Sequence, residues 1–83
     1  MDVRVVFLGP LAERFGGRER LVGAPEQGFK LDELKALLTL GREELRPSLE
    51  PPVRAAVDRE FVTGDAGVQP GQEVAFLPPF SGG

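Results

Sequence analysis

The 83-residue sequence contains no cysteine and no histidine. Without cysteine the chain has no disulfide and no thiol nucleophile, and without histidine it can form neither a Ser-His-Asp triad nor a cysteine–histidine metal site. A chain of this length folds as one small domain with little room for a deep catalytic pocket. We therefore expect a protein that binds no metal or cofactor of its own and works through partner proteins.

A basic stripe and long apolar runs are also missing. The formal net charge is −3, and arginines lie beside acidic residues, as in Arg18-Glu19-Arg20. Nucleic-acid binding domains usually concentrate positive charge on one face. No apolar run reaches the roughly 18–20 residues that span a bilayer, and Met1-Asp2-Val3-Arg4 has no signal-peptide pattern. The sequence predicts a cytoplasmic protein that binds neither nucleic acid nor membrane.

The apolar pattern predicts strands and one principal helix. Strands are expected at residues 3–8, 18–23, 53–57, 61–62 and 73–77, the helix at 31–40, and short helical turns at 11–15 and 42–46. Val3, Val5 and Phe7 alternate along the first strand, whereas leucines at 31, 34, 37 and 38 form one helical stripe. Lys30 precedes the helix and is a poor N-cap. Residues 47–52 are expected to form a loop because prolines there block helix formation.

This order of elements predicts an α+β domain. It fits the β-grasp arrangement, in which a mixed sheet carries one main helix on one face and the first and last strands lie side by side at the sheet centre. We expect the β-grasp domain to cover residues 1–77 and an extended, flexible tail to cover residues 78–83.

The tail contains the most specific pattern in the chain. Two prolines favour an extended polyproline conformation, and six extended residues reach about 20 Å. Two glycines without Cβ atoms can enter a channel too narrow for other residues. An aromatic residue upstream can anchor the tail in a pocket of a partner. The six residues are Pro78, Pro79, Phe80, Ser81, Gly82 and Gly83.

Residues 74–83, Val-Ala-Phe-Leu-Pro-Pro-Phe-Ser-Gly-Gly, resemble the C-terminal signature of the MoaD/ThiS family of ubiquitin-like sulfur carriers, in its MoaD-type branch. Residues 3–16, 31–34 and 53–58 resemble the family's first strand and short helix, its helix entry and its third strand. The chain departs from the family at Asp58, where asparagine is usual, and at Lys30, where threonine usually caps the helix.

The resemblance implies a role in molybdenum cofactor biosynthesis. An E1-like, MoeB-type enzyme would use ATP to adenylate Gly83, and a sulfurtransferase or cysteine desulfurase would supply the sulfur of a thiocarboxylate. The chain would be the small subunit of molybdopterin synthase, in a heterotetramer with the MoaE-type large subunit, and would donate sulfur to a cyclic pyranopterin precursor. The residues implied in the tail and in partner binding are Phe76, Pro78, Pro79, Phe80, Ser81 and Gly82.

Phe76 stays open between two roles, because it fits either the core or the docking face. Other functions also stay open at this point. The carrier could serve thiamine synthesis, transfer-RNA thiolation or cysteine synthesis. A ubiquitin-like modifier would instead form isopeptide bonds through Gly83, and a plain binding module would have an inert tail.

Overall fold

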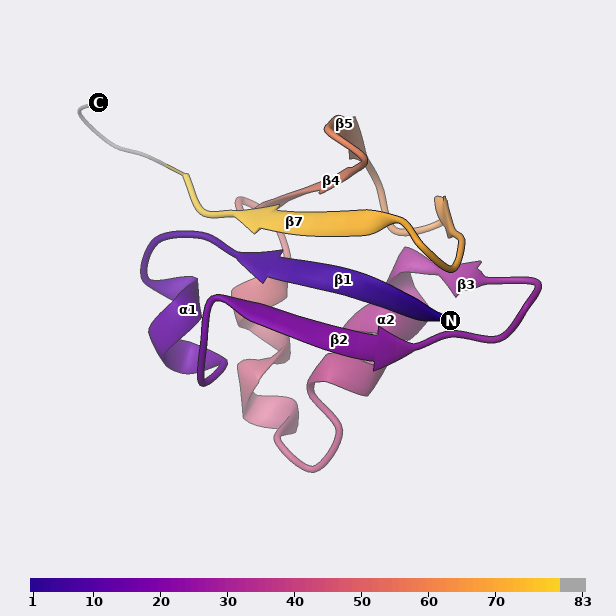
Figure 1. The fold of residues 1–83 in the computed structure, drawn as a ribbon. Helices are drawn as coiled ribbons and strands as arrows, with labels where there is room; N and C mark the ends of the chain where they lie inside the picture. Colours follow the sequence, from indigo (N-terminus) through magenta and orange to yellow (C-terminus); the bar gives the residue numbers. More distant parts are fainter. Residues whose placement is uncertain (80–83) are drawn as a thin grey trace.

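The computed structural model describes residues 1–79, which form a five-stranded mixed sheet with one principal helix packed against it (Figure 1). The strands are β1 (Asp2–Phe7), β2 (Glu19–Gly23), β3 (Phe29–Lys30), β4 (Arg54–Val57), β5 (Glu60–Val62), β6 (Gly67–Val68) and β7 (Glu73–Leu77). The helices are α1 (Leu11–Arg14), α2 (Leu31–Leu38) and the 3₁₀ helix η1 (Glu43–Leu49). The predicted α+β class is confirmed.

The sheet has the strand order β2-β1-β7-β4-β5. β1 and β7 pair in parallel, from Arg4 opposite Glu73 to Phe7 opposite Phe76. On its other side β7 pairs antiparallel with β4. The first and last strands are therefore neighbours in the middle of the sheet, as the β-grasp arrangement predicts.

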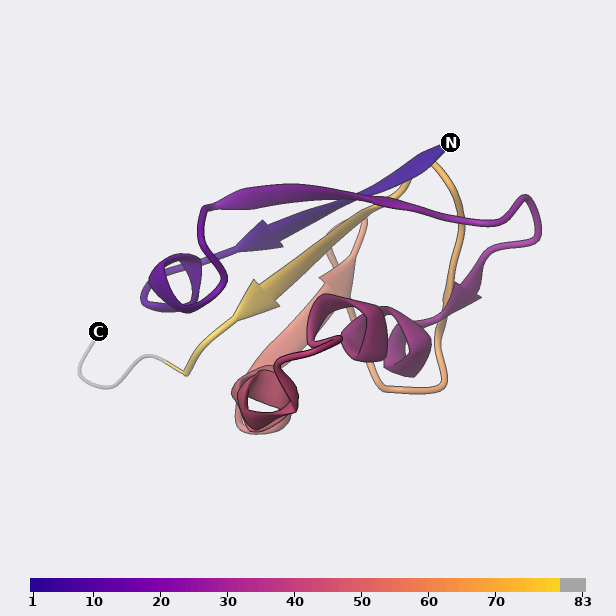
Figure 2. The same cartoon turned by 90° about the horizontal axis from the view of Figure 1, so that it is seen from below.

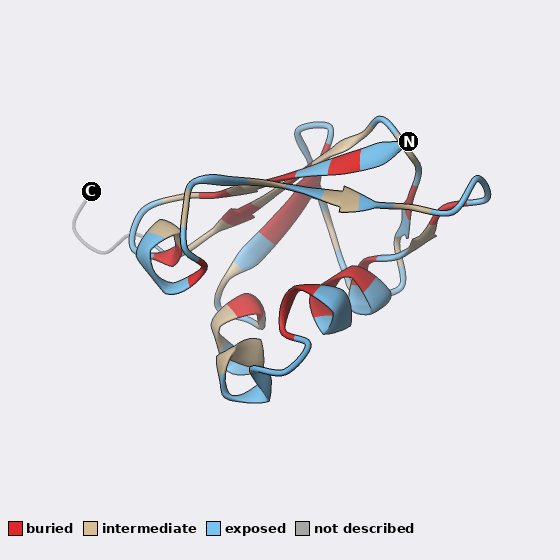
Figure 3. Ribbon diagram, turned by 60° about the horizontal axis from the view of Figure 1, so that its bottom comes forward, coloured by how far each residue is buried: buried red, intermediate tan, exposed pale blue. Residues whose placement is uncertain are grey.

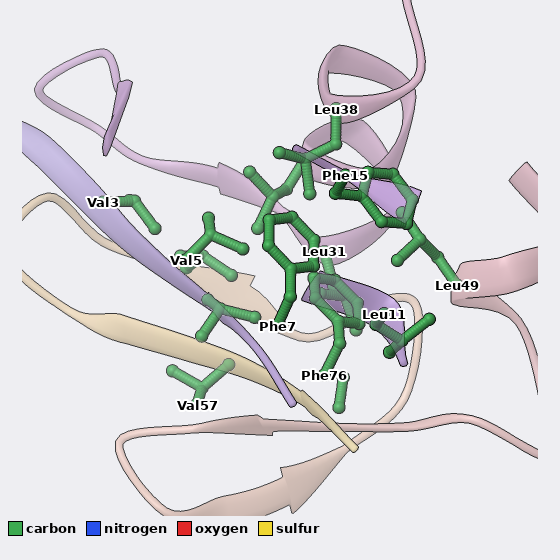
Figure 4. Packing of buried hydrophobic residues seen from close by; sticks show 14 residues of the cluster. Val3, Val5, Phe7, Leu11, Phe15, Leu31, Leu38, Leu49, Val57 and Phe76 are labelled. Carbon is green, nitrogen blue, oxygen red and sulfur yellow. The ribbon is translucent and has the colours of Figure 1, made fainter. Parts of the chain in front are cut away.

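The core fills the space between the sheet and the helices. Val3, Val5 and Phe7 of β1 point into it and are at most 1% exposed. The Phe7 ring stacks on Phe15 with a centroid distance of 4.6 Å and on Phe76 at 6.0 Å (Figure 4). Burial of each such side chain contributes about 1.5–3 kcal/mol.

Within residues 1–79, helices cover one face of the sheet. α2 and η1 lie on the same side of it (Figure 2), and the buried residues of both face the strands (Figure 3). Leu31 and Leu34 of α2 and Leu49 of η1 are each at most 1% exposed. The predicted leucine stripe thus faces the sheet, except that Leu37 is 46% exposed.

Three predicted details were wrong. A second sheet, made of the two-residue strands β3 and β6, had no counterpart in the sequence prediction, because two residues show no alternation. η1 extends through Pro47 into the predicted loop, since burial of Leu49 holds the chain in helical turns. α2 ends at Leu38 rather than residue 40, and the buried Thr39 hydroxyl donates to the Lys35 carbonyl.

Arg20, on the edge strand β2, forms hydrogen bonds with the C-terminal ends of both α1 and α2. It is half-buried on the core face, opposite Val5. Its guanidinium donates to the carbonyl of Phe15 at the end of α1 (2.9 Å) and to that of Leu38 at the end of α2 (3.4 Å). A cation at helix C-termini satisfies free carbonyls and interacts favourably with the helix dipole.

The turn between β4 and β5 contains two residues in the left-handed region, Asp58 (φ 46°) and Arg59 (φ 73°). The Asp58 carboxylate accepts hydrogen bonds from the Glu73 N–H at 2.9 Å and from the Gln72 amide at 3.0 Å. These bonds tie the hairpin to the start of β7 and compensate the unfavourable backbone of Asp58. The Arg59 side chain makes no hydrogen bond within residues 1–79, so its backbone is uncompensated.

The two turn residues should therefore respond to glycine in opposite directions. Arg59→Gly relieves a positive φ and should raise the free energy of unfolding by about 1 kcal/mol. Asp58→Gly removes two hydrogen bonds and should lower it by about 1 kcal/mol. Urea unfolding of both variants measures the difference, and changes of the same sign would contradict this account of the turn.

Candidate functional site

The chain leaves the sheet at the end of β7. Leu77 is the last strand residue and is half-buried, Pro78 is half-buried, and Pro79 is exposed. Proline cannot donate to a strand ladder, so the double proline ends the pairing at this point. The predicted tail residues Phe80, Ser81, Gly82 and Gly83 lie outside the described residues. The structure thus places Pro78 and Pro79 where the sheet stops.

Gly9 makes room for this exit. The β1–β7 ladder ends with a hydrogen bond from the Leu8 N–H to the Phe76 carbonyl (3.1 Å), after which β1 turns away at Gly9 with φ +59°. A Cβ built on Gly9 would lie 3.3 Å from Cγ of Pro78. Both the backbone conformation and the space beside Pro78 therefore favour glycine here.

The sheet face opposite α2, which we call the open face, adjoins the exit. Its members follow from the strand register, because paired residues point to the same side of a sheet. One row crosses the strands through Val6, Ala75, Ala56 and Phe61. The open face consists of Arg4, Val6, Glu19, Leu21, Arg54, Ala56, Phe61, Glu73, Ala75 and Leu77.

The open face divides into a polar and an apolar part. Arg4 pairs with Glu19 at 3.1 Å and with Glu73 at 3.7 Å, at the end away from the exit. Nearer the exit, Phe61 is 54% exposed, and the Arg54 guanidinium lies 3.5 Å from the centroid of its ring. An exposed aromatic ring with a stacked arginine is typical of a protein-binding surface.

The structure decides between the two roles left open for Phe76. Its side chain is 0% exposed and stacks on Phe7, so it is a core residue. Leu77, its neighbour on the opposite side of the strand, lies on the open face beside Arg54. Phe61 and Leu21 were not selected from the sequence. The sequence carries no signal for this placement, because it depends on the register of β2 with β1 and of β5 with β4.

A cleft of about 590 Å³ opens between α2 and the β5 edge, lined by Asp32, Lys35, Glu50 and Phe61 among others. Lys35 is 6% exposed, and its amine lies 3.2 Å from Glu50 and 4.0 Å from Asp32. The hydrogen bond donated by Arg46 (2.8 Å) lowers the pKa of Glu50, with Lys35 acting in the same direction and partial burial opposing both. Glu50 is therefore held as a carboxylate, unsuited to proton donation.

Residues 1–79 contain no group of three histidine, cysteine or acidic side chains arranged to hold a metal ion. Within the same residues no helix is long and apolar enough to cross a membrane.

The sequence profile of the ThiS family matches residues 5–83. The chain belongs to the ThiS family. The resemblance to ubiquitin-like sulfur carriers noted in the sequence is thereby confirmed, and the matched segment includes the tail. No curated protein is similar enough in sequence to count as a relative of this ThiS-family chain.

Solved structures with the same fold come from several organisms. SAMP1 from Haloferax volcanii is 19% identical, with a TM-score of 0.83 and 100% of both chains covered. A protein described as molybdopterin converting factor subunit 1, from Pyrococcus furiosus, is 21% identical, with a TM-score of 0.79, 96% of this ThiS-family chain and 99% of its own covered. A complex of subunits 1 and 2 of molybdopterin-converting factor from Helicobacter pylori contains a chain that is 26% identical, with a TM-score of 0.69 and both chains fully covered. These similarities confirm the ubiquitin-like β-grasp fold.

Gly9→Ala tests the geometry of the exit. The substitution forces a Cβ into a left-handed backbone and towards Pro78, so it should lower the free energy of unfolding by about 1 kcal/mol. Gly41 has a similar φ of +77°, and a Cβ built there would meet nothing within 4 Å, so Gly41→Ala isolates the backbone cost. A chemical-shift change at Leu77 in Gly9→Ala, absent from Gly41→Ala, is expected by NMR. Equal responses at Leu77 would contradict the contact with Pro78.

The Glu50 ion pairs should appear in the pH dependence of stability. Because folding lowers the pKa of Glu50, its carboxylate stabilises the fold above the unfolded value of about 4.3 and loses this contribution as pH falls through the folded value. Glu50→Gln should therefore lower the free energy of unfolding at pH 7 and weaken its decline on acidification. Glu44→Gln is the control, since the one ion pair of Glu44 within residues 1–79 is with Arg42 at the surface. Parallel pH profiles for Glu50→Gln and the unmodified chain would contradict this role.

Proposed function

We propose that this chain is a sulfur carrier that serves as the small subunit of molybdopterin synthase, with the carboxylate of Gly83 as its working group. The observation that carries the proposal is the exit of β7 beside an apolar surface, in a ThiS-family domain matched through residue 83. A partner that covers the open face would receive the chain end at the rim of the contact.

The chemistry begins with an unreactive group. A carboxylate is a poor electrophile, because resonance stabilises its carbonyl and oxide is a poor leaving group. An adenylating enzyme would transfer AMP from ATP to Gly83 and release pyrophosphate. A persulfide sulfur would then attack the carbonyl carbon and displace AMP, and a thiol would reduce the resulting acyl disulfide to the thiocarboxylate. This chain would supply the acyl group, and its partners would supply the acid–base groups.

The carrier would meet three kinds of partner through one surface. These are the MoeB-type adenylating enzyme, the sulfurtransferase or cysteine desulfurase, and the MoaE-type large subunit, with which it would form a heterotetramer in the cytoplasm. The Helicobacter pylori structure, a complex of subunits 1 and 2, supports a large-subunit partner. Because the same small surface would serve all three, binding would have to be sequential.

Two alternatives have support of their own. The ThiS family match fits a carrier for thiamine synthesis, transfer-RNA thiolation or cysteine synthesis equally well. The similarity to SAMP1, a small archaeal modifier protein, supports a protein modifier. The Phe-Leu-Pro-Pro-Phe segment at residues 76–80 favours the molybdopterin carrier.

Thiocarboxylation is the first test. Incubation with ATP, the adenylating enzyme and a sulfur donor should replace one oxygen of the Gly83 carboxylate by sulfur, visible in the intact mass. Deletion of Gly82 and Gly83 should abolish this change and leave thermal unfolding intact, because the core cluster lies between Val3 and Phe76. An unchanged mass with components active on another carrier would refute the sulfur-carrier proposal.

The open face provides the second test. Phe61→Glu places a charge in the centre of the proposed contact and should weaken binding to the large subunit at least about ten-fold by calorimetry. Leu40→Glu is the matched control, because Leu40 is 77% exposed and follows α2, away from the open face. Equal affinities for Phe61→Glu and Leu40→Glu would contradict docking through the open face.

A further inference from the structure

The chain has very few groups that could react with its own activated end. Eight of its ten basic residues are arginines, and it has no cysteine. An activated acyl group is attacked by unprotonated amines and thiols, whereas the guanidinium of arginine stays protonated. Among side chains the candidate acyl acceptors are therefore the amines of Lys30 and Lys35.

Lys35 is shielded from reaction. It is 6% exposed, on the inner side of α2, and its amine lies 3.2 Å from a Glu50 oxygen. The amine donates a hydrogen bond to the Glu50 carboxylate, so its nitrogen is already engaged and points into the ion pair. An acyl donor would also have to displace the ion pair to reach the nitrogen.

Lys30 is accessible. It is exposed, and its amine forms no ion pair within residues 1–79. Its backbone is fixed by pairing with Gly67 in the β3–β6 sheet and by a hydrogen bond from its N–H to the Glu33 carboxylate (2.9 Å). Gly67 has no side chain, and a Cβ built there would meet nothing within 4 Å. The surface beside Lys30 is thus open on its strand-partner side.

Lys30 and the point where β7 ends lie at opposite ends of the described domain. β3 lies near the start of β7, and β7 runs away from it to Leu77 (Figure 1). The same separation is visible from below (Figure 2). An acyl group on Gly83 would therefore reach Lys30 of a second copy. Donor and acceptor surfaces differ, and such a head-to-tail contact generates open chains rather than a closed dimer.

We propose that Lys30 is a modification site, the amine at which this chain accepts the activated Gly83 of a second copy to form an isopeptide-linked linear chain. The Lys30 nitrogen attacks the carbonyl carbon of the acyl adenylate, the bond to the phosphate oxygen breaks, AMP leaves, and the amine proton passes to solvent. The inference rests on the proposed adenylation of Gly83. When no sulfur donor is present, the adenylated Gly83 would form this isopeptide bond instead of a thiocarboxylate.

Accessibility can be tested without any enzyme. Trace acetylation of the folded chain with acetic anhydride should label Lys30 at least about ten-fold faster than Lys35, by mass spectrometry of its peptides. In denaturant the two rates should become similar, because Lys35 is then released. Similar labelling of both lysines in the folded chain would overturn the inference and leave the proposed function unaffected.

Conjugation itself is tested with the adenylating enzyme and ATP in the absence of a sulfur donor. A ladder of linked copies is expected on a denaturing gel, with the tryptic peptide that starts at Glu60 joined to Lys30. Lys30→Arg should abolish the ladder. Lys35→Arg, checked for thermal unfolding, should retain it.

The outcomes separate the two proposals. Pyrophosphate release without a ladder, a conjugate mapped to Lys35 or to the Met1 amino group, or a monomer cyclised on itself would each overturn the role of Lys30 while sparing adenylation. Absence of pyrophosphate release would contradict the proposed function and this inference with it.

Discussion

The parallel pairing of β1 with β7 is the constraint on which the rest of the structure depends. It places the last strand between β1 and β4, so β7 is paired on both edges, as far as Phe76 on the β1 side and Leu77 on the β4 side. Phe76 and Phe7 stack beneath this pair. The end of the chain therefore continues from a central strand of the sheet. It leaves only where Gly9 and Pro78 end the ladder.

The same arrangement leaves the two faces of the sheet in different environments. α2 and η1 use one face to bury the core, so mutations there act on stability. The other face has no covering element among residues 1–79 and carries the apolar row from Val6 to Phe61. Because the core lies on the opposite side of the strands, the proposed docking of a partner on the open face would leave the core undisturbed. The adjoining chain end would then be presented at the edge of the contact.

Much of the fold could be predicted from the sequence, because the responsible patterns are local. The alternation of Val3, Val5 and Phe7 and the leucines of α2 indicate their elements directly. β3 and β6 could not be found, since each depends on pairing between residues far apart in the sequence. η1 continues past Pro47 because Leu49 is buried by tertiary contacts, which outweigh the local preference of proline.

The candidate site was predictable in part. The position of Pro78 and Pro79 after the last strand follows from proline chemistry, and the structure confirms it. Phe61 could not be assigned to the open face without the register that sets it beside Ala56 and Ala75. Phe76 and Leu77 are adjacent apolar residues in the sequence, and only the sheet shows which one points outward.

The donation of sulfur by Gly83 is the central claim, and a single-turnover experiment tests it most directly. Purified carrier bearing a sulfur-isotope label in its thiocarboxylate would be mixed with the large subunit and the cyclic pyranopterin precursor, without ATP. The account predicts that the label moves into the dithiolene product as the carrier returns to its carboxylate mass. Label that stays on Gly83, or a product whose sulfur is unlabelled, would contradict it.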